Sequence, residues 1–230
     1  MIAIGRHGVD SIPQEVTTKG EGLCIQDTDR YLCFMRSPEI TKERILKQSG
    51  RLFNTQGYKA TSLSDITKAS GLTKGAIYQH FKNKGRLEAE TLTHLSMIMF
   101  DRLKEQIKAK ATAPEKLWAI FHYFESYITH PPLRGGCPLL NAAVESDDSN
   151  PPLRKRAVVI LDSLRDSIMR ILDNGIRYGQ LKRGMDKEHV ATLIIATLEG
   201  AIMMSKLRGN NRDICSVIRH LENVVNELEL

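Results

Sequence analysis

The sequence predicts an all-α fold, in which an N-terminal three-helix domain with a helix-turn-helix precedes a C-terminal helical domain. From Pro38 to the end of the chain, apolar residues recur at the three- and four-residue spacing that places them on one face of a helix. Capping residues, prolines and glycines interrupt this pattern. No segment alternates apolar and polar residues as a half-buried strand would.

The first predicted helix covers residues 38–56. Ser37 and Pro38 suit the N-cap and the first turn of a helix, and Gly57 ends the helical pattern. Lysines and arginines occupy many of the remaining positions. The apolar side chains that share one face are Ile45, Leu46, Leu52 and Phe53.

Two short helices are predicted next. Residues 62–65, Ser-Leu-Ser-Asp, resemble a capping box with Asp in place of the usual Glu or Gln, and they open a helix that ends near Gly71. Thr73 caps a second helix over residues 74–81. Two helices of about two turns, joined by a short turn that contains glycine, form the signature of a helix-turn-helix.

The rest of the chain is predicted to be helical as well, with breaks at Pro131-Pro132 and at Pro151-Pro152. Asn83 caps a long helix that runs to about residue 110. The further helices are expected at about residues 114–129, 139–146, 152–179, 187–208 and 211–228.

The chain is therefore divided into three parts, residues 1–36, 37–84 and 85–230. Residues 1–36 lack a sustained apolar period, so two interpretations stay open for them. They form either a disordered extension or a segment upstream of a true start at Met35. Residues 37–84 form the predicted helix-turn-helix domain, and residues 85–230 form the second domain.

The positive charge is concentrated in one segment. The formal net charge of the chain is +6. Residues 37–86 hold ten Lys or Arg and three acidic residues, whereas the other 180 residues hold 23 basic and 24 acidic side chains. This localisation is what phosphate binding requires, so it indicates a nucleic-acid partner.

Composition argues against several other classes of protein. The apolar run from Val190 to Met204 is interrupted by Glu199, and the first 22 residues contain Asp10, Glu15 and Glu21, so neither a membrane span nor a secretory signal is expected. We therefore expect a cytoplasmic protein. The four cysteines form no C-x-x-C pair, which argues against a structural metal or a disulfide framework. No cofactor is expected.

Residues 57–87, GYKATSLSDITKASGLTKGAIYQHFKNKGRL, resemble the DNA-binding domain of the TetR/AcrR family of transcriptional regulators. The resemblance is carried by the Gly-aromatic turn, the capped helix with Asp65, the turn at Gly71 and the run from Lys74 to Lys84. It implies a repressor that binds a palindromic double-stranded DNA operator as a homodimer.

The resemblance also implies which residues contact DNA. The first turn of a helix in the major groove reads the bases, so the residues at the start of the third helix are expected to face base edges or nearby phosphates. These are Thr73, Lys74, Gly75 and Ala76. The residues that match phosphate contacts in the family are Tyr78, His80 and Lys84, with Thr61, Ser62 and Ser64 at the start of the preceding helix.

In the family, the helices after this domain bind an effector and form the dimer. Two apolar faces are candidates for the dimer bundle, although each can also be internal core. They are Val190, Leu193, Ile194, Thr197, Ala201 and Met204, and Ile214, Val217, Ile218, Leu221, Val224 and Leu228. Residues expected either to line an effector pocket or to fill the core are Trp118, Phe121, His122, Phe124, Tyr127 and Met169.

A cysteine offers an alternative kind of sensing. The segment Arg134-Gly-Gly-Cys-Pro-Leu-Leu-Asn141 resembles that of a TetR subgroup in which some members respond to electrophiles or oxidants through the cysteine. A helix N-terminus and Arg134 would stabilise a thiolate at Cys137, and Lys206 is expected nearby. The effector is thus either a small molecule or an oxidant, and a passive cysteine also stays open.

Two other classes of function fit the sequence less well. An enzyme would need a catalytic constellation, and the sequence contains no Ser/His/Asp set, glycine-rich phosphate loop or H-E-x-x-H motif. RNA readers commonly expose aromatic residues on a sheet or repeat, a pattern absent from this sequence. A non-enzymatic DNA-binding regulator is the preferred interpretation, and activation is left open beside repression.

Overall fold

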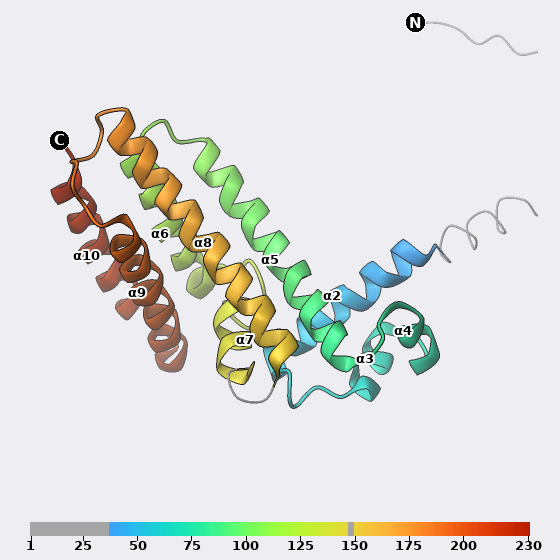
Figure 1. The fold of residues 1–230 in the computed structure, drawn as a ribbon. Helices are drawn as coiled ribbons and strands as arrows, with labels where there is room; N and C mark the ends of the chain where they lie inside the picture. The colour runs from blue at the N-terminus through green and yellow to red at the C-terminus, as the bar shows by residue number, and fades with distance from the viewer. Residues whose placement is uncertain (1–36, 147–149) are drawn as a thin grey trace, which may run out of the picture. The chain divides into compact units, whose positions relative to one another are not determined.

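The computed structural model describes residues 37–146 and 150–230, and its regular elements over those ranges are α-helices (Figure 1). An isolated antiparallel bridge between Leu181 and Glu229 is the one β-type pairing in them. Residues Pro38–Leu230 form one compact unit. The predicted all-α fold is confirmed. The expectations for residues 1–36, including the start at Met35, lie outside the described residues, as do Cys24 and Cys33.

The N-terminal helices are α2 (Pro38–Gln56), α3 (Leu63–Ser70) and α4 (Lys74–His80), and they match the predicted bounds to within one residue. Ser62 and Asp65 form the predicted capping box, and Gly71 ends α3 in the left-handed conformation, with φ 67°. Since each of these signals acts within a few residues, the sequence alone determines the helix ends. The small core that joins the three helices consists of Ile45, Phe53, Tyr58, Ile66, Ile77 and Phe81.

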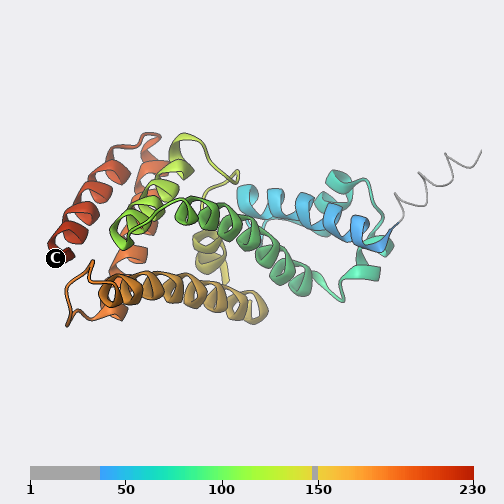
Figure 2. The same cartoon turned by 90° about the horizontal axis from the view of Figure 1, so that it is seen from above.

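Helix α5 (Lys84–Lys108) continues from α4 and packs against α2, α6, α7 and α8. The side chain of Asn83 caps its first turn by accepting a hydrogen bond from the backbone N–H of Arg86 at 2.8 Å. Figures 1 and 2 both show α5 running from the helix-turn-helix to the C-terminal helices. Any displacement of α5 therefore affects both halves of the described chain.

The remaining helices are α6 (Ala113–Thr129), α7 (Pro138–Ser146), α8 (Pro151–Arg177), α9 (Lys187–Arg208) and α10 (Arg212–Leu228). Aromatic residues of α6, including Phe121 and Phe124, lie in the core where α6 meets α8, α9 and α10. The short helix α7 contacts α2 on one side and α8 on another. It is thus placed between the helix-turn-helix and the C-terminal helices.

Helix α9 is long and apolar enough to cross a membrane by length and composition. One side of it, however, is packed inside the fold, with Ala191, Ile194 and Leu198 at most 2% exposed. A core helix passes the same test of composition, and the packing identifies α9 as one.

The prediction that one apolar face of α9 forms the dimer bundle is wrong for part of that face. Ile194 and Ala201 point into the core, whereas Leu193 and Met204 are 48% and 38% exposed. Apolar residues surround most of this helix, so periodicity alone does not distinguish the core side from the free side. The exposed apolar stripe consists of Leu193, Ala196, Met203, Met204 and Leu207.

Candidate functional site

The outer face of α4 has the geometry of a recognition surface. Ile77 and Phe81 are each 1% exposed and anchor the helix to α2 and α3, while Lys74, Gly75 and Tyr78 face outward. The nearest atom to a Cβ built on Gly75 is the Thr73 hydroxyl at 3.8 Å. The first turn of α4 can therefore approach another molecule closely.

Hydrogen bonds fix the first turns of α3 and α4. The Thr73 hydroxyl accepts a hydrogen bond from the N–H of Ala76 at 3.2 Å. The Ser62 hydroxyl donates to the Asp65 carboxylate at 2.6 Å and accepts from the Asp65 N–H at 3.2 Å. The hydrogen bonds from Ser62 lower the pKa of Asp65. Ser64 is exposed beside this cap. The capping bonds fix the backbone at the start of α3, and this end of the helix faces solvent.

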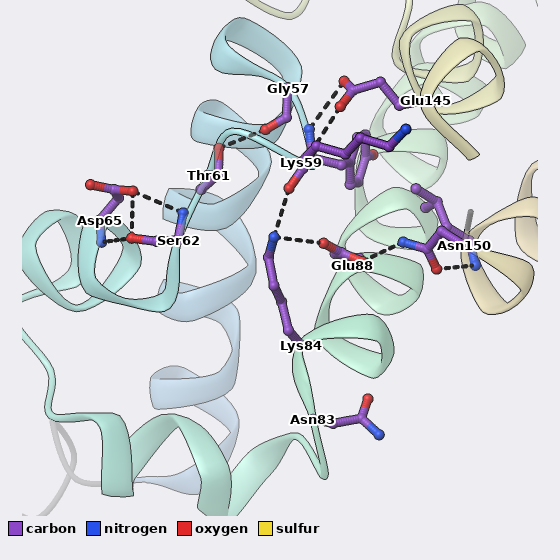
Figure 3. A network of polar contacts seen from close by, with 12 residues as sticks. Gly57, Lys59, Thr61, Ser62, Asp65, Asn83, Lys84, Glu88, Glu145 and Asn150 are labelled. Atoms are coloured by element: carbon purple, nitrogen blue, oxygen red, sulfur yellow. Dashed lines mark hydrogen bonds and ion pairs between the residues drawn. The ribbon is translucent and has the colours of Figure 1, made fainter. Parts of the chain in front are cut away.

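Two of the predicted DNA-contact residues have other partners. Thr61 is fully buried, and its hydroxyl donates to the carbonyl of Gly57 at 2.7 Å. The prediction that its side chain contacts DNA is corrected, because a buried hydroxyl cannot reach a phosphate. Lys84 donates to the carbonyl of Tyr58 at 2.7 Å and pairs with Glu88 at 3.2 Å, so it is engaged within the fold (Figure 3).

The other predicted contacts lie at the surface. Tyr78 is 49% exposed, and His80 is half-buried with its ring tilted against Phe81. The structure thus brings Ser62, Ser64, Thr73, Lys74, Gly75, Ala76, Tyr78 and His80 to the exposed parts of α3 and α4.

Glu145 of α7 bonds directly to the loop that leads into α3. Its two carboxylate oxygens accept the backbone N–H groups of Tyr58 at 3.1 Å and Lys59 at 3.0 Å (Figure 3). Glu88 continues the network, since it accepts from the side chain of Asn150 at 2.6 Å. These contacts could not be predicted from local sequence patterns, because the partners are 62 to 87 residues apart.

A second set of bonds joins the end of α2 to the segment before α7. The side-chain amide of Asn54 donates to the carbonyls of Arg134 at 2.6 Å and Gly136 at 3.0 Å. Asn141 donates to the Asn54 side-chain oxygen at 2.9 Å. A Cβ on Gly135, whose φ is 100°, would lie 1.8 Å from the Asn54 carbonyl oxygen. Only glycine permits this contact between the two backbones.

The C-terminal helices form an apolar cavity of about 280 Å³ that is partly open to solvent. It lies between α7, α8 and α9, and α7 therefore faces the cavity with some residues and the helix-turn-helix with others. Its lining residues are Leu139, Leu140, Ala143, Ser146, Arg154, Ala157, Val158, Leu161, Ile195 and Glu199.

None of the residues predicted to line a pocket borders this cavity. Phe121, Phe124 and Tyr127 are at most 3% exposed and fill the core. His122 is at the surface, within 3.5 Å of Glu125 and Glu222, and does not border this cavity. Trp118 and Met169 are partly buried and pack against the core, away from the cavity lining. The large side chains of α6 thus fill the core, and the cavity lies elsewhere, between α7, α8 and α9.

Cys137 is buried against a carboxyl group. The thiol is 1% exposed and donates to the Oε1 atom of Glu199 at 2.9 Å. Burial and the neighbouring Glu199 raise the pKa of Cys137 well above its usual value. The backbone N–H groups of Leu139 and Leu140 at the helix N-terminus do act to lower this pKa, as expected, but burial and Glu199 outweigh them, so the predicted thiolate is not favoured. Lys206 does lie nearby, but it donates to the carbonyl of Gly135.

Glu199 is a buried acidic residue. In the sequence it is notable only because it interrupts the apolar run from Val190 to Met204. The residue is 9% exposed, and its Oε2 atom has no hydrogen-bond partner in the described part of the chain. Burial raises the pKa of Glu199 to about 7, and the hydrogen bond from Cys137 acts in the opposite direction. At neutral pH the carboxyl is thus poised between its two protonation states.

Family models match most of the described chain. A model described as "Bacterial regulatory proteins, tetR family" matches residues 45–90, and one described as "Tetracyclin repressor-like, C-terminal domain" matches residues 113–221. The first contains α3 and α4 entirely, and the second contains the whole of α6 to α9.

Individual proteins agree with the family models. A TetR transcriptional regulator from Chloroflexus aurantiacus is 35% identical, with a TM-score of 0.80 over 85% of this chain and 98% of that chain. The fatty acid metabolism regulator protein of Bacillus subtilis is 28% identical over 80% of this chain and 91% of its own length. A structure of FadR from Bacillus subtilis in complex with stearoyl-CoA is 25% identical, with a TM-score of 0.64 over 79% and 96% of the chains.

The raised pKa of Glu199 makes stability depend on pH. A group whose pKa is higher in the folded state stabilises the fold below its unfolded pKa, near 4.5, and this contribution is lost as pH rises through about 7. Relative to Glu199→Gln, we expect the unfolding free energy of the wild type to fall by about 3 kcal/mol between pH 4 and 8. Urea unfolding across that range measures the difference.

Glu188→Gln is the matched control, because Glu188 lies on the same helix and is 65% exposed. Its stability profile should follow that of the wild type. Parallel profiles for the wild type and Glu199→Gln would contradict a buried carboxyl with a raised pKa.

Proposed function

This chain belongs to the TetR family of DNA-binding transcriptional regulators, and from that premise we propose that it is a repressor released from its operator by a small molecule. Two copies would occupy one palindromic operator in the cytoplasm, where the chromosome lies. The single observation that carries the proposal is the exposed first turn of α4, which lies in the segment that holds the basic excess.

Recognition follows from the chemistry of α4. Lys74 and the open backbone at Gly75 lie in the first turn, which reads base edges when a helix enters the major groove. Tyr78, His80, Ser62 and Ser64 would contact phosphates and set the register. Lys84 can contribute to DNA binding only in part, since Tyr58 and Glu88 hold it.

A second copy would cover the exposed apolar stripe of α9, defined above. One short recognition helix reads few base pairs, so two copies that reach successive major grooves, about 34 Å apart, are needed for specificity. Exposed apolar stripes on a folded chain commonly mark protein interfaces. Val217 and Val224 of α10 are half-buried and would extend the interface.

Release would proceed through α7. This helix borders the cavity through Leu139, Leu140 and Ala143, and it holds the entrance to α3 through Glu145. A ligand that binds better when α7 is displaced would favour a dimer whose two α4 helices no longer match the groove spacing. The redox alternative at Cys137 is less well supported, because the thiol is buried and its pKa is raised.

Substitutions on α4 separate base recognition from phosphate contact. Lys74→Ala should weaken operator binding by about 1–3 kcal/mol and change the preferred sequence, whereas Tyr78→Phe should weaken binding to all duplexes similarly. Footprinting on the DNA upstream of its own gene, followed by titration of single-base variants, measures both effects. Lys155→Ala, an exposed lysine on α8, is the control. Unchanged affinity and preference in Lys74→Ala would refute this placement of the recognition helix.

A charge in the exposed stripe of α9 tests the dimer. Leu193→Glu should shift sedimentation equilibrium from dimer to monomer and weaken operator binding at least tenfold, because desolvating an unpaired carboxylate at an interface is costly. Met97→Glu places the same charge at an exposed apolar residue of α5 and should leave the dimer intact. A dimer of normal stability in Leu193→Glu would place the interface elsewhere.

A further inference from the structure

The cavity between α7, α8 and α9 is mostly apolar, and its polar lining residues are Ser146, Arg154 and Glu199. Leu140, Val158, Leu161 and Ile195 supply most of its wall, and Arg154 lies exposed among the lining residues. A volume of about 280 Å³ accommodates a molecule with on the order of ten non-hydrogen atoms, if each takes about the 30 Å³ that a water molecule occupies in the liquid. Most of such a molecule would have to be hydrocarbon.

The buried ionisable group in this lining is the carboxyl group of Glu199. Its Oε1 atom accepts a hydrogen bond from Cys137, whereas its buried Oε2 atom has no partner within the described residues. Buried polar atoms in proteins are nearly always hydrogen-bonded, and an exception calls for an explanation. A donor supplied by a ligand would satisfy this atom.

We propose that this cavity binds a hydrophobic amine, whose protonated nitrogen donates to the Oε2 atom of Glu199. The proposal depends on the proposed function only for its regulatory consequence. A cation offsets the desolvation of the buried carboxylate, which a neutral hydroxyl does only in part. A fatty acid fits less well, because its chain would cover Oε2 without a donor even if its carboxylate reached Arg154.

Binding at Glu199 would reach the helix-turn-helix by a short route. Glu199 is bonded to Cys137, and Cys137 directly follows Gly136, whose carbonyl accepts a hydrogen bond from Asn54 at the end of α2. An amine that draws the carboxylate toward the cavity competes with the thiol for it. The bond between Cys137 and Glu199 would then weaken, and the segment that holds Asn54 would be free to shift.

Three probes with the same chain length test the ligand class. Isothermal titration calorimetry of the full chain with octylamine, octan-1-ol and octanoate should show octylamine binding at least tenfold more tightly than the other two. Glu199→Gln keeps the side-chain volume and an acceptor oxygen for Cys137. It should reduce the octylamine affinity at least tenfold and change that of octan-1-ol less than threefold.

Two further variants keep the test decisive. Ala143→Leu adds bulk at an exposed position in the cavity lining and should weaken octylamine and octan-1-ol alike. Glu188→Gln should bind all three probes as the wild type does. The proposal is overturned if octylamine does not bind, if Glu199→Gln binds it unchanged, or if octanoate binds most tightly. Because calorimetry requires no DNA, failure of operator binding would refute the proposed repressor and leave this result standing.

Discussion

The position of the helix-turn-helix depends on the hydrogen bonds between α7 and the end of α2. Glu145 accepts two consecutive backbone amides, and Asn54 and Asn141 join the α2 terminus to the segment before α7. Because these bonds hold main-chain groups, they fix the path of the chain into α3, and the packed core then fixes α4. Lys84, Glu88 and Asn150 extend the same network to the start of α8. A regulator needs such a junction, since a helix-turn-helix that moved independently of the C-terminal helices could not be controlled by a ligand bound to them.

Much of the fold could be predicted because its helix ends are set by local chemistry. The Ser62 and Asp65 capping box, the left-handed Gly71 and the Asn83 cap each act over three or four residues. The outward face of α4 was predictable for the same reason, as its register follows from the cap at Thr73. The burial of Thr61 and the pairing of Glu145 with Tyr58 depend on tertiary packing, on which a single sequence carries no signal.

The sensing half departs further from prediction, and the reasons are physical. A cysteine at a helix N-terminus is expected to ionise readily, yet burial of the thiol raises the pKa of Cys137, and Glu199, 62 residues away in sequence, raises it further. The aromatic residues of α6 are candidates for lining a pocket by their sequence pattern, but large side chains of this kind pack in the core. The cavity instead lies beside small residues such as Ala143 and Ala157.

The most direct measurement of coupling through α7 is hydrogen exchange at the amides of Tyr58 and Lys59, with the cavity empty and with it filled by octylamine. Coupling through α7 predicts that ligand binding speeds exchange at these two amides severalfold, because the bonds to Glu145 weaken, while exchange at Leu221 in the core of α10 stays unchanged. Unchanged exchange at Tyr58 and Lys59 in the ligand-saturated protein would contradict it, and would mean that α7 does not carry the signal.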